Sequence, residues 1–302
     1  MVAIKKVDFQ KSAGSSSLCT IELLCIGNEL LIGKTLNTNA QWVAERITRL
    51  GGKVSRETTV KDNLDEIASS IRDAVKRKPD FIITSGGLGP THDDMTLQGV
   101  ARAVGRQVQL NRTAIQFMKA HYRRVAPTII IQLNKPRLKM ARLPVGSEPI
   151  ENPVGSAPAV ITRYGRVRIV SLPGVPRELK AIFNRSVAPL IRAKTGNVSF
   201  FEERLMVRGI VESELSPIID RVMNRYPNVF IKSHPRGGKG PGDSRLELHF
   251  SSTSSDERKT REEILNAVAM ISRSLVNRRV PKRDRKRVEF HSVQSRSHLN
   301  SS

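Results

Sequence analysis

Apolar residues are grouped in short runs along the first two thirds of the chain, and polar segments rich in glycine separate these runs. The runs TIELLCIG at 20–27 and DFIIT at 80–84 have the length and composition of strands that are buried on both faces. Residues 53–60 fit a further strand. Strands that alternate with helix-length segments predict an α/β unit with a parallel-type sheet covered by helices on both faces.

The segments between the strands have apolar residues at helical spacing. Asn39 is placed to cap a first helix, which Gly51 ends, and Asn63 with Glu66 has the spacing of a capping box that begins a second helix. The same spacing predicts later helices over Thr96–Val104, Arg112–Arg124 and Pro176–Lys194.

The prolines between residues 127 and 158 predict a stretch that is mostly loop, because proline cannot donate a backbone hydrogen bond. Residues 159–164 and 166–172 predict a hairpin about Gly165. We therefore expect a first domain over residues 20–194, preceded by a flexible arm over residues 1–19.

A smaller α+β unit is predicted over residues 195–276. Its apolar patterns fit strand, helix, strand, strand and helix, in the order Phe201–Val207, Glu214–Tyr226, Val229–Ser233, Arg245–Phe250 and Asp256–Leu275. Residues 277–302 have no apolar period and many basic side chains, which predicts a disordered basic tail.

The composition excludes a membrane protein, and the charge indicates which kind of ligand to expect. Only 38% of the 302 residues are hydrophobic, no apolar run approaches the roughly 20 residues of a bilayer crossing, and no signal-peptide core follows the N-terminus. We expect a soluble, cytoplasmic protein with no membrane partner. The net charge is +23, of which +16 falls on residues 1–194, so an anionic ligand such as a phosphate compound or nucleic acid is favoured.

The two cysteines predict no disulfide. Cys19 and Cys25 lie six residues apart on one expected strand, which separates them by about 20 Å. We expect both to be small core residues.

The strongest candidate for chemistry is the segment TSGGLGPTHDDMT at residues 84–96, directly after a predicted strand. Its three glycines allow a backbone to approach a phosphate closely, and its hydroxyls can donate to phosphate oxygens; these residues are Ser85, Gly86, Gly87, Gly89, Thr91 and Thr96. Asp93 and Asp94 could hold a divalent metal ion, and His92 could complete its shell. The alternative is a plain glycine turn whose aspartates cap the next helix.

Three further motifs are weak when they are taken alone. The segment GNELLIGKT at 27–35 resembles a phosphate-binding P-loop, but five residues separate its glycines where the P-loop has four. The segments ENPVGSAP at 151–158 and LPGVPRE at 172–178 each predict only a turn, and Pro176 suits the first position of a helix.

Taken together and in this order, these motifs resemble the molybdopterin-binding-like (MoaB/Mog) domain, in the variant found at the N-terminus of CinA-type proteins. The resemblance covers about residues 20–194, and the following unit looks like the small KH-like domain of that variant. It implies a three-layer α/β fold that binds an adenine- or pterin-containing phosphate compound.

The resemblance also implies an activity, namely hydrolysis of the diphosphate of ADP-ribose with a divalent metal (Mg or Co) and potassium. Asp62 and Asp94 would then be catalytic, Asp93 and Asp94 metal ligands, and Pro173 and Gly174 part of the ligand site. Related Mog domains instead adenylylate molybdopterin, and their pattern usually has arginine where this chain has Asp93. We expect no amidase activity, because a basic tail stands where the CinA-type amidohydrolase domain would follow.

The sequence is compatible with several functions. The chain could be a hydrolase, a non-catalytic nucleotide- or pterin-binding module, an adenylyltransferase-like protein, or a nucleic-acid-binding protein. Gly237 and Gly240 match a GXXG clamp, although here the motif joins two predicted strands. The basic tail could make weak nucleic-acid contacts, and we expect a homo-oligomer.

Overall fold

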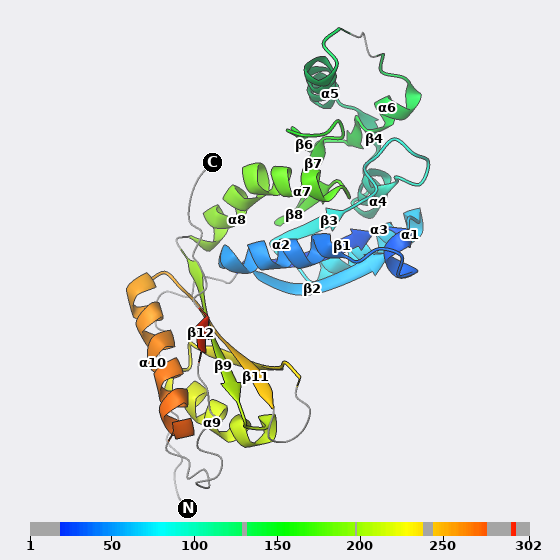
Figure 1. Ribbon diagram of the computed structural model, residues 1–302. Coiled ribbons are helices and arrows are strands. Elements are labelled where there is room, and N and C mark those ends of the chain that lie inside the picture. Colours follow the sequence, from blue (N-terminus) through cyan, green and yellow to red (C-terminus); the bar gives the residue numbers. More distant parts are fainter. Residues whose placement is uncertain (1–18, 129–131, 197, 238–243, 277–290, 294–302) are drawn as a thin grey trace, which may run out of the picture. The chain divides into compact units, whose positions relative to one another are not determined.

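The chain forms two compact units in a computed structural model, which describes residues 19–128, 132–196, 198–237, 244–276 and 291–293 (Figure 1). The first unit comprises residues 1–44 and 52–195, and the second comprises residues 45–51 and 196–302. Among the described residues, no helix has both the length and the apolar character needed to cross a bilayer.

A six-stranded sheet forms the centre of the first unit, in the order β2-β1-β3-β8-β7-β6. Its parallel part consists of β2 (Lys53–Val60), β1 (Thr20–Ile26), β3 (Phe81–Ser85) and β8 (Val167–Leu172). Strands β7 (Ala159–Tyr164) and β6 (Glu148–Ile150) are antiparallel to their neighbours. The predicted α/β class with a largely parallel sheet is therefore confirmed, and so is the hairpin about Gly165.

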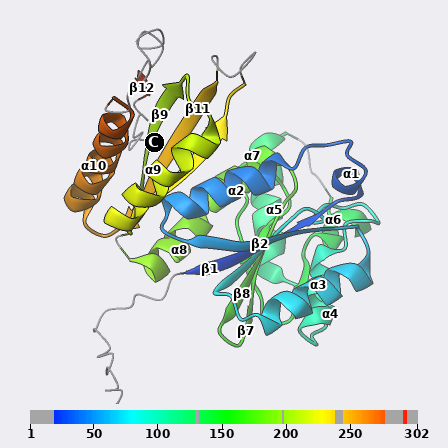
Figure 2. The same ribbon diagram turned by 90° about the horizontal axis from the view of Figure 1, so that it is seen from below.

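Helices cover both faces of this sheet, and Figure 2 shows α3 and α4 on one face with α2 and α7 on the other. The helices are α1 (Asn28–Leu31), α2 (Thr38–Arg49), α3 (Leu64–Lys76), α4 (Thr96–Ala103), α5 (Arg112–Val125), α6 (Lys135–Lys139), α7 (Pro176–Ile182), the π-helix η1 (Phe183–Val187) and α8 (Ala188–Thr195). Strands Val108–Leu110 (β4) and Arg142–Pro144 (β5) pair as a separate ribbon. The core under α3 and α4 includes Ile67, Ile71, Ile82, Val100 and Ile169.

One of the two predicted helix caps is confirmed and one is wrong. The side chain of Asn63 accepts hydrogen bonds from the backbone N–H groups of Asp65 and Glu66 at the start of α3. Asn39, however, lies inside α2. The oxygen Oδ1 of Asn37 instead accepts from the N–H of Ala40 at 3.2 Å.

The proline-rich stretch is more regular than predicted. It contains α6, β5 and β6, because its prolines occupy positions that need no N–H donor. Pro136 lies in the first turn of α6, which Asn134 caps, and Pro149 lies in the edge strand β6. The π-helix η1 interrupts the single helix expected over 176–194. In a regular α-helix, the ring of Pro189 would clash with the carbonyl group of Arg185, four residues earlier, and the π turn relieves this clash.

Both cysteines are free and buried in β1 or directly before it, as predicted. Burial is the largest cause that raises the pKa of each thiol to about 11. Cys19 and Cys25 are therefore unreactive core residues.

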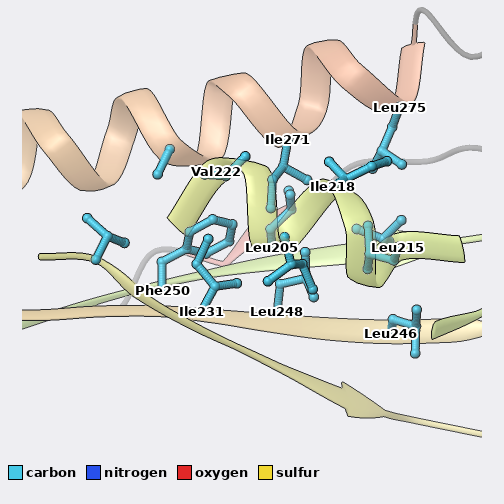
Figure 3. Packing of buried hydrophobic residues seen from close by; sticks show 14 of the residues in the cluster. Leu205, Leu215, Ile218, Val222, Ile231, Leu246, Leu248, Phe250, Ile271 and Leu275 are labelled. Carbon is cyan, nitrogen blue, oxygen red and sulfur yellow. The ribbon is translucent and has the colours of Figure 1, made fainter. Parts of the chain in front are cut away.

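The second unit packs two helices on one face of an antiparallel sheet with the order β10-β11-β9-β12. Its elements are β9 (Ser199–Arg208), α9 (Glu212–Arg225), β10 (Phe230–Pro235), β11 (Arg245–Ser254), α10 (Glu257–Val276) and β12 (His291–Val293). In Figure 3, Leu205, Leu248 and Phe250 of the sheet face Val222 and Ile271 of the helices. The first five elements follow the predicted order, and the KH-like assignment stays a prediction.

Two predictions fall at the edge of what the structure describes. Residues 291–293 form β12, which pairs with β9 between His291 and Met206, so for these three residues the expected disordered tail is wrong. The remaining tail, most of the N-terminal arm and residues 238–243 of the GXXG segment lie outside the described residues.

Candidate functional site

A cleft of about 480 Å³ opens at the carboxyl ends of the parallel strands in the first unit. The residues that follow β1, β2, β3 and β8 line it, together with α1 and the start of α2. Open α/β sheets bind ligands at this edge. The predicted site residues that line the cleft are Asp62, Ser85, Gly86, Gly87, Gly89, Asp93, Asp94, Pro173 and Gly174.

The glycine loop after β3 needs its glycines for steric reasons. Gly86 has a φ of +105°, and a Cβ there would lie 2.2 Å from the carbonyl oxygen of Ile26. Gly87 has a φ of +65°, and its Cβ would lie 2.2 Å from Oγ1 of Thr96. The loop therefore passes against β1 with bare backbone, which is the property expected of a close approach to a ligand.

Two of the predicted hydroxyl donors do not line the cleft. Thr96 is fully buried, and its hydroxyl donates to the carbonyl oxygen of Gly86 at 2.8 Å. This threonine shapes the glycine loop from behind, so its expected role as a phosphate donor is wrong. Thr91 is exposed, and its hydroxyl and N–H donate to the carboxylate of Asp94.

Asp94 is held in place by the loop that precedes it. Its Oδ2 accepts from the N–H of Thr91 at 2.9 Å and from the hydroxyl of the same residue. A Cβ on Gly89 would lie 2.6 Å from that Oδ2, so only glycine leaves room for the carboxylate. Asp93 is exposed, and hydrogen bonds from Thr91 and from its own backbone lower its pKa.

Asp62 follows β2 and lines the same cleft as the glycine loop. Its Oδ2 accepts from the N–H of Asn28 at 2.8 Å, which links β2 to the first turn of α1. Burial raises the pKa of Asp62, the Asn28 N–H opposes this shift, and the charges of Glu29, Asp93 and Asp94 raise the pKa further. The carboxylates of this site therefore act on one another.

Asn39 is a site residue that the sequence did not identify as one. Its Nδ2 donates to the carbonyl oxygen of Gly174 at 2.8 Å and to Oγ of Ser85 at 3.1 Å, so one amide connects α2, β3 and the turn after β8. Its Oδ1 is buried and has no hydrogen-bond partner among the described residues. The sequence around Asn39 predicts only a helix, and nothing in it indicates the contacts with Ser85 and Gly174.

Glu178 is a second site residue that the sequence did not identify, although the segment LPGVPRE contains it. Asn152 is buried, and its Nδ2 donates to a carboxylate oxygen of Glu178 at 2.7 Å. Oδ1 of Asn152 accepts from the N–H groups of Val154 and Gly155. The segment at 151–158 is thus a braced turn against α7, and Glu178 lines the cleft beside it.

The lining of the cleft is acidic even though the chain is strongly basic. It contains five carboxylates and no lysine, arginine or histidine among the described residues; the carboxylates are Glu29, Asp62, Asp93, Asp94 and Glu178. No group of three or more His, Cys, Asp or Glu side chains in the described residues is gathered closely enough to hold a metal ion. The positive net charge of residues 1–194 is therefore not located in the lining of the cleft.

The segment that resembles a P-loop is not a phosphate nest in this structure. Its residues 28–31 form the single turn α1, and Lys34 is exposed. Only Gly27, Glu29, Leu30 and Thr35 of this segment line the cleft.

Residues 22–193 match the family described as the probable molybdopterin binding domain, and this range contains every residue that lines the cleft. The chain belongs to this family. The resemblance found in the sequence is thereby confirmed for the first unit. The KH-like second unit and the missing amidohydrolase domain stay predictions.

Relatives extend the likeness beyond the first unit. A protein of Pyrobaculum arsenaticum is 39% identical over 255 residues, which are 84% of this chain and 92% of that protein. One of Aeropyrum pernix is 39% identical over 253 residues, again 84% of this chain and 92% of the relative. A solved structure described as the protein CinA with unknown function from Thermoplasma acidophilum is 38% identical, with a TM-score of 0.52, and covers 57% of this chain and 98% of that one.

Proposed function

We propose that the cleft binds a nucleotide or pterin compound through a diphosphate group and hydrolyses that group, with ADP-ribose or a similar dinucleotide as substrate. The observation that supports this proposal best is the acidic lining around a bare glycine backbone. A diphosphate alone would be repelled by five carboxylates, whereas a diphosphate with a divalent cation would be attracted.

The donor chemistry of the cleft fits a hard divalent cation such as Mg²⁺. Magnesium retains several waters and is held by one or two carboxylates plus substrate phosphates, so it needs no pre-formed cage of protein ligands. Asp94 and Asp93 would hold the ion, which would neutralise the phosphate oxygens and lower the pKa of a bound water.

The chain's own groups have separate roles in this proposal. The backbone N–H groups of Gly87 to Gly89 would stabilise the charge that develops on the diphosphate oxygens, whereas the N–H of Gly86 donates to the carbonyl oxygen of Leu172 at 3.1 Å. Asp62 is the candidate general base, because burial and neighbouring carboxylates raise its pKa and make it a better proton acceptor. Asn39 and Ser85 fix the distance between the glycine loop and the turn at Pro173 and Gly174.

The second candidate is a binding module that performs no reaction. It is favoured by the absence, among the described residues, of a cluster of three or more metal-ligating side chains. An adenylyltransferase-like activity is the third candidate, and it rests on the resemblance to Mog domains alone.

One set of measurements separates the hydrolase from the binding module. Calorimetry with the full chain compares ADP-ribose and AMP in the presence of Mg²⁺ or Co²⁺ and in EDTA, and chromatography of the same samples detects AMP release. We expect ADP-ribose to bind better with the metal, to bind better than AMP, and to be cleaved. Exchange of KCl for NaCl tests the potassium requirement.

Two other results would contradict parts of the proposal. Metal-enhanced binding without AMP release would favour the binding module. Equal, metal-independent binding of AMP and ADP-ribose would remove the diphosphate site, because the two ligands share only the adenosine and one phosphate.

A further inference from the structure

One stretch of the first unit carries basic residues without any acidic residue between them. Residues 95–147 contain ten lysines and arginines and no aspartate or glutamate, although acidic residues occupy 28 of the 302 positions of the chain. This stretch includes α5 and α6, which lie together at one end of the first unit (Figure 1).

Three of these cations form a stripe on the exposed side of α5. Arg112, Lys119 and Arg123 are seven and four residues apart, which places them about two turns and one turn from each other on one side of the helix. All three are exposed. The opposite side of α5 is buried through Ala114 and Met118.

The stripe has no counter-charge within the described residues. No hydrogen bond or ion pair is formed by the side chains of Arg112, Lys119 or Arg123 there, and α5 contains no acidic residue. Glu148 lies in the neighbouring strand β6, and it pairs with Arg163. Glu151 follows β6, and it pairs with Arg185. The positive charge of the stripe therefore faces solvent without compensation.

We propose that this α5 stripe binds the phosphate backbone of duplex nucleic acid without sequence preference. The stripe is about 16 Å long, and phosphates of one strand are about 3.4 Å apart along the axis of the duplex, so three cations can meet phosphates on one strand. A membrane surface fits less well, because the apolar side of α5 is buried and cannot insert into lipid.

The proposed surface is independent of the cleft. None of the three cations lines the cleft, whose own lining is acidic and would repel a nucleic-acid backbone. The interaction also differs from any contact made by the basic tail, since it requires the folded helix.

The test uses the full chain and a fluorescently labelled duplex of 20 base pairs in two unrelated sequences. The variant Arg112→Gln/Lys119→Gln/Arg123→Gln is compared with the matched control Lys53→Gln/Arg56→Gln/Arg72→Gln. The control removes three exposed cations from β2 and α3 of the same unit, and so it has the same net charge. Circular dichroism checks that both variants fold.

We expect the α5 variant to lose about tenfold or more in affinity near 100 mM salt and its salt slope to fall by about two to three, while the control changes little. Arg112→Lys/Arg123→Lys should retain the binding, because phosphate contacts need charge rather than guanidinium geometry. Equal losses of affinity in both triple variants would overturn the proposal, because binding would then depend on the net positive charge of the protein and not on the α5 stripe. Binding to anionic vesicles in place of the duplex would overturn it as well.

Discussion

The side-chain amide of Asn39 donates a hydrogen bond at 2.8 Å to the carbonyl oxygen of Gly174, which lies 135 residues later in the chain. The same nitrogen reaches Ser85 at the end of β3, so a single side chain sets the width of the cleft where three elements meet. Loss of this amide should therefore affect both stability and ligand binding.

We expect Asn39→Ala to lower the free energy of unfolding by about 1 to 2 kcal/mol, since two hydrogen bonds are lost. Ligand affinity should also fall, because the turn at Gly174 loses its tether to α2. Urea denaturation and calorimetry with ADP-ribose measure the two effects. Gln41→Ala, on the exposed side of the same helix, is the control, and an equal effect of both substitutions would contradict the role of Asn39.

The second prediction concerns the glycine loop. Gly86→Ala should lower the free energy of unfolding by at least about 3 kcal/mol, because a Cβ would lie 2.2 Å from the carbonyl oxygen of Ile26 and the φ of +105° disfavours any side chain. Gly105 also has a positive φ of +67°, but its Cβ would meet nothing within 4 Å.

Gly105→Ala therefore isolates the backbone strain and should cost about 1 to 2 kcal/mol. Denaturant midpoints of the two variants, measured by circular dichroism, give the comparison. Equal midpoints would mean that the loop can move away from β1.

Features that depend on neighbouring residues were predictable from the sequence. The cap at Asn63 lies next to its partners Asp65 and Glu66, and the strand at 20–26 is an uninterrupted apolar run. The glycine loop was placed correctly because it follows such a run directly.

Features that depend on tertiary contacts were not predictable in this way. The local sequence predicts a helix cap at Asn39, because the actual partners of this side chain are 46 and 135 residues away. The local sequence predicts a phosphate donor at Thr96, because the burial of this hydroxyl against Gly86 has no local signature. The acidity of the cleft arises from carboxylates that lie far apart in the chain, whereas the net charge reports only the sum over the chain.

The third prediction tests the role of Asp94 in catalysis. Asp94→Asn should leave the fold intact, because an amide oxygen can still accept from the N–H and hydroxyl of Thr91. Metal-dependent AMP release should fall about 100-fold or more, since the charge that would hold the cation is lost. Asp73→Asn, an exposed carboxylate on α3, serves as the control.

Thermal melts of both variants and chromatographic detection of AMP complete this test. If Asp94→Asn turned over at the wild-type rate, Asp94 would have no catalytic role. If it unfolded, Asp94→Glu would show whether a displaced carboxylate restores any AMP release.

The last prediction concerns the pH dependence that Asp62 confers. Burial, the largest cause, raises the pKa of Asp62 above its ordinary value of 3.8. The folded state thus binds this proton more tightly than the unfolded state does, so the stability that Asp62 contributes is present at low pH and is lost as the pH rises through the raised pKa. Asp62→Asn should therefore raise the melting temperature at pH 7.5, by about 1 to 2 °C, and raise it less at pH 4.5.

Asp73 provides a control of opposite sign for this experiment. A hydrogen bond and the charge of Lys76 lower the pKa of Asp73, so its contribution is present at neutral pH and is lost as the pH falls through the lowered pKa. Asp73→Asn should then lower the melting temperature slightly at pH 7.5. AMP release by Asp62→Asn should be weak at every pH, whereas wild-type release should rise as Asp62 ionises. If Asp62→Asn raised the melting temperature but released AMP at the wild-type rate, Asp62 would not be the general base.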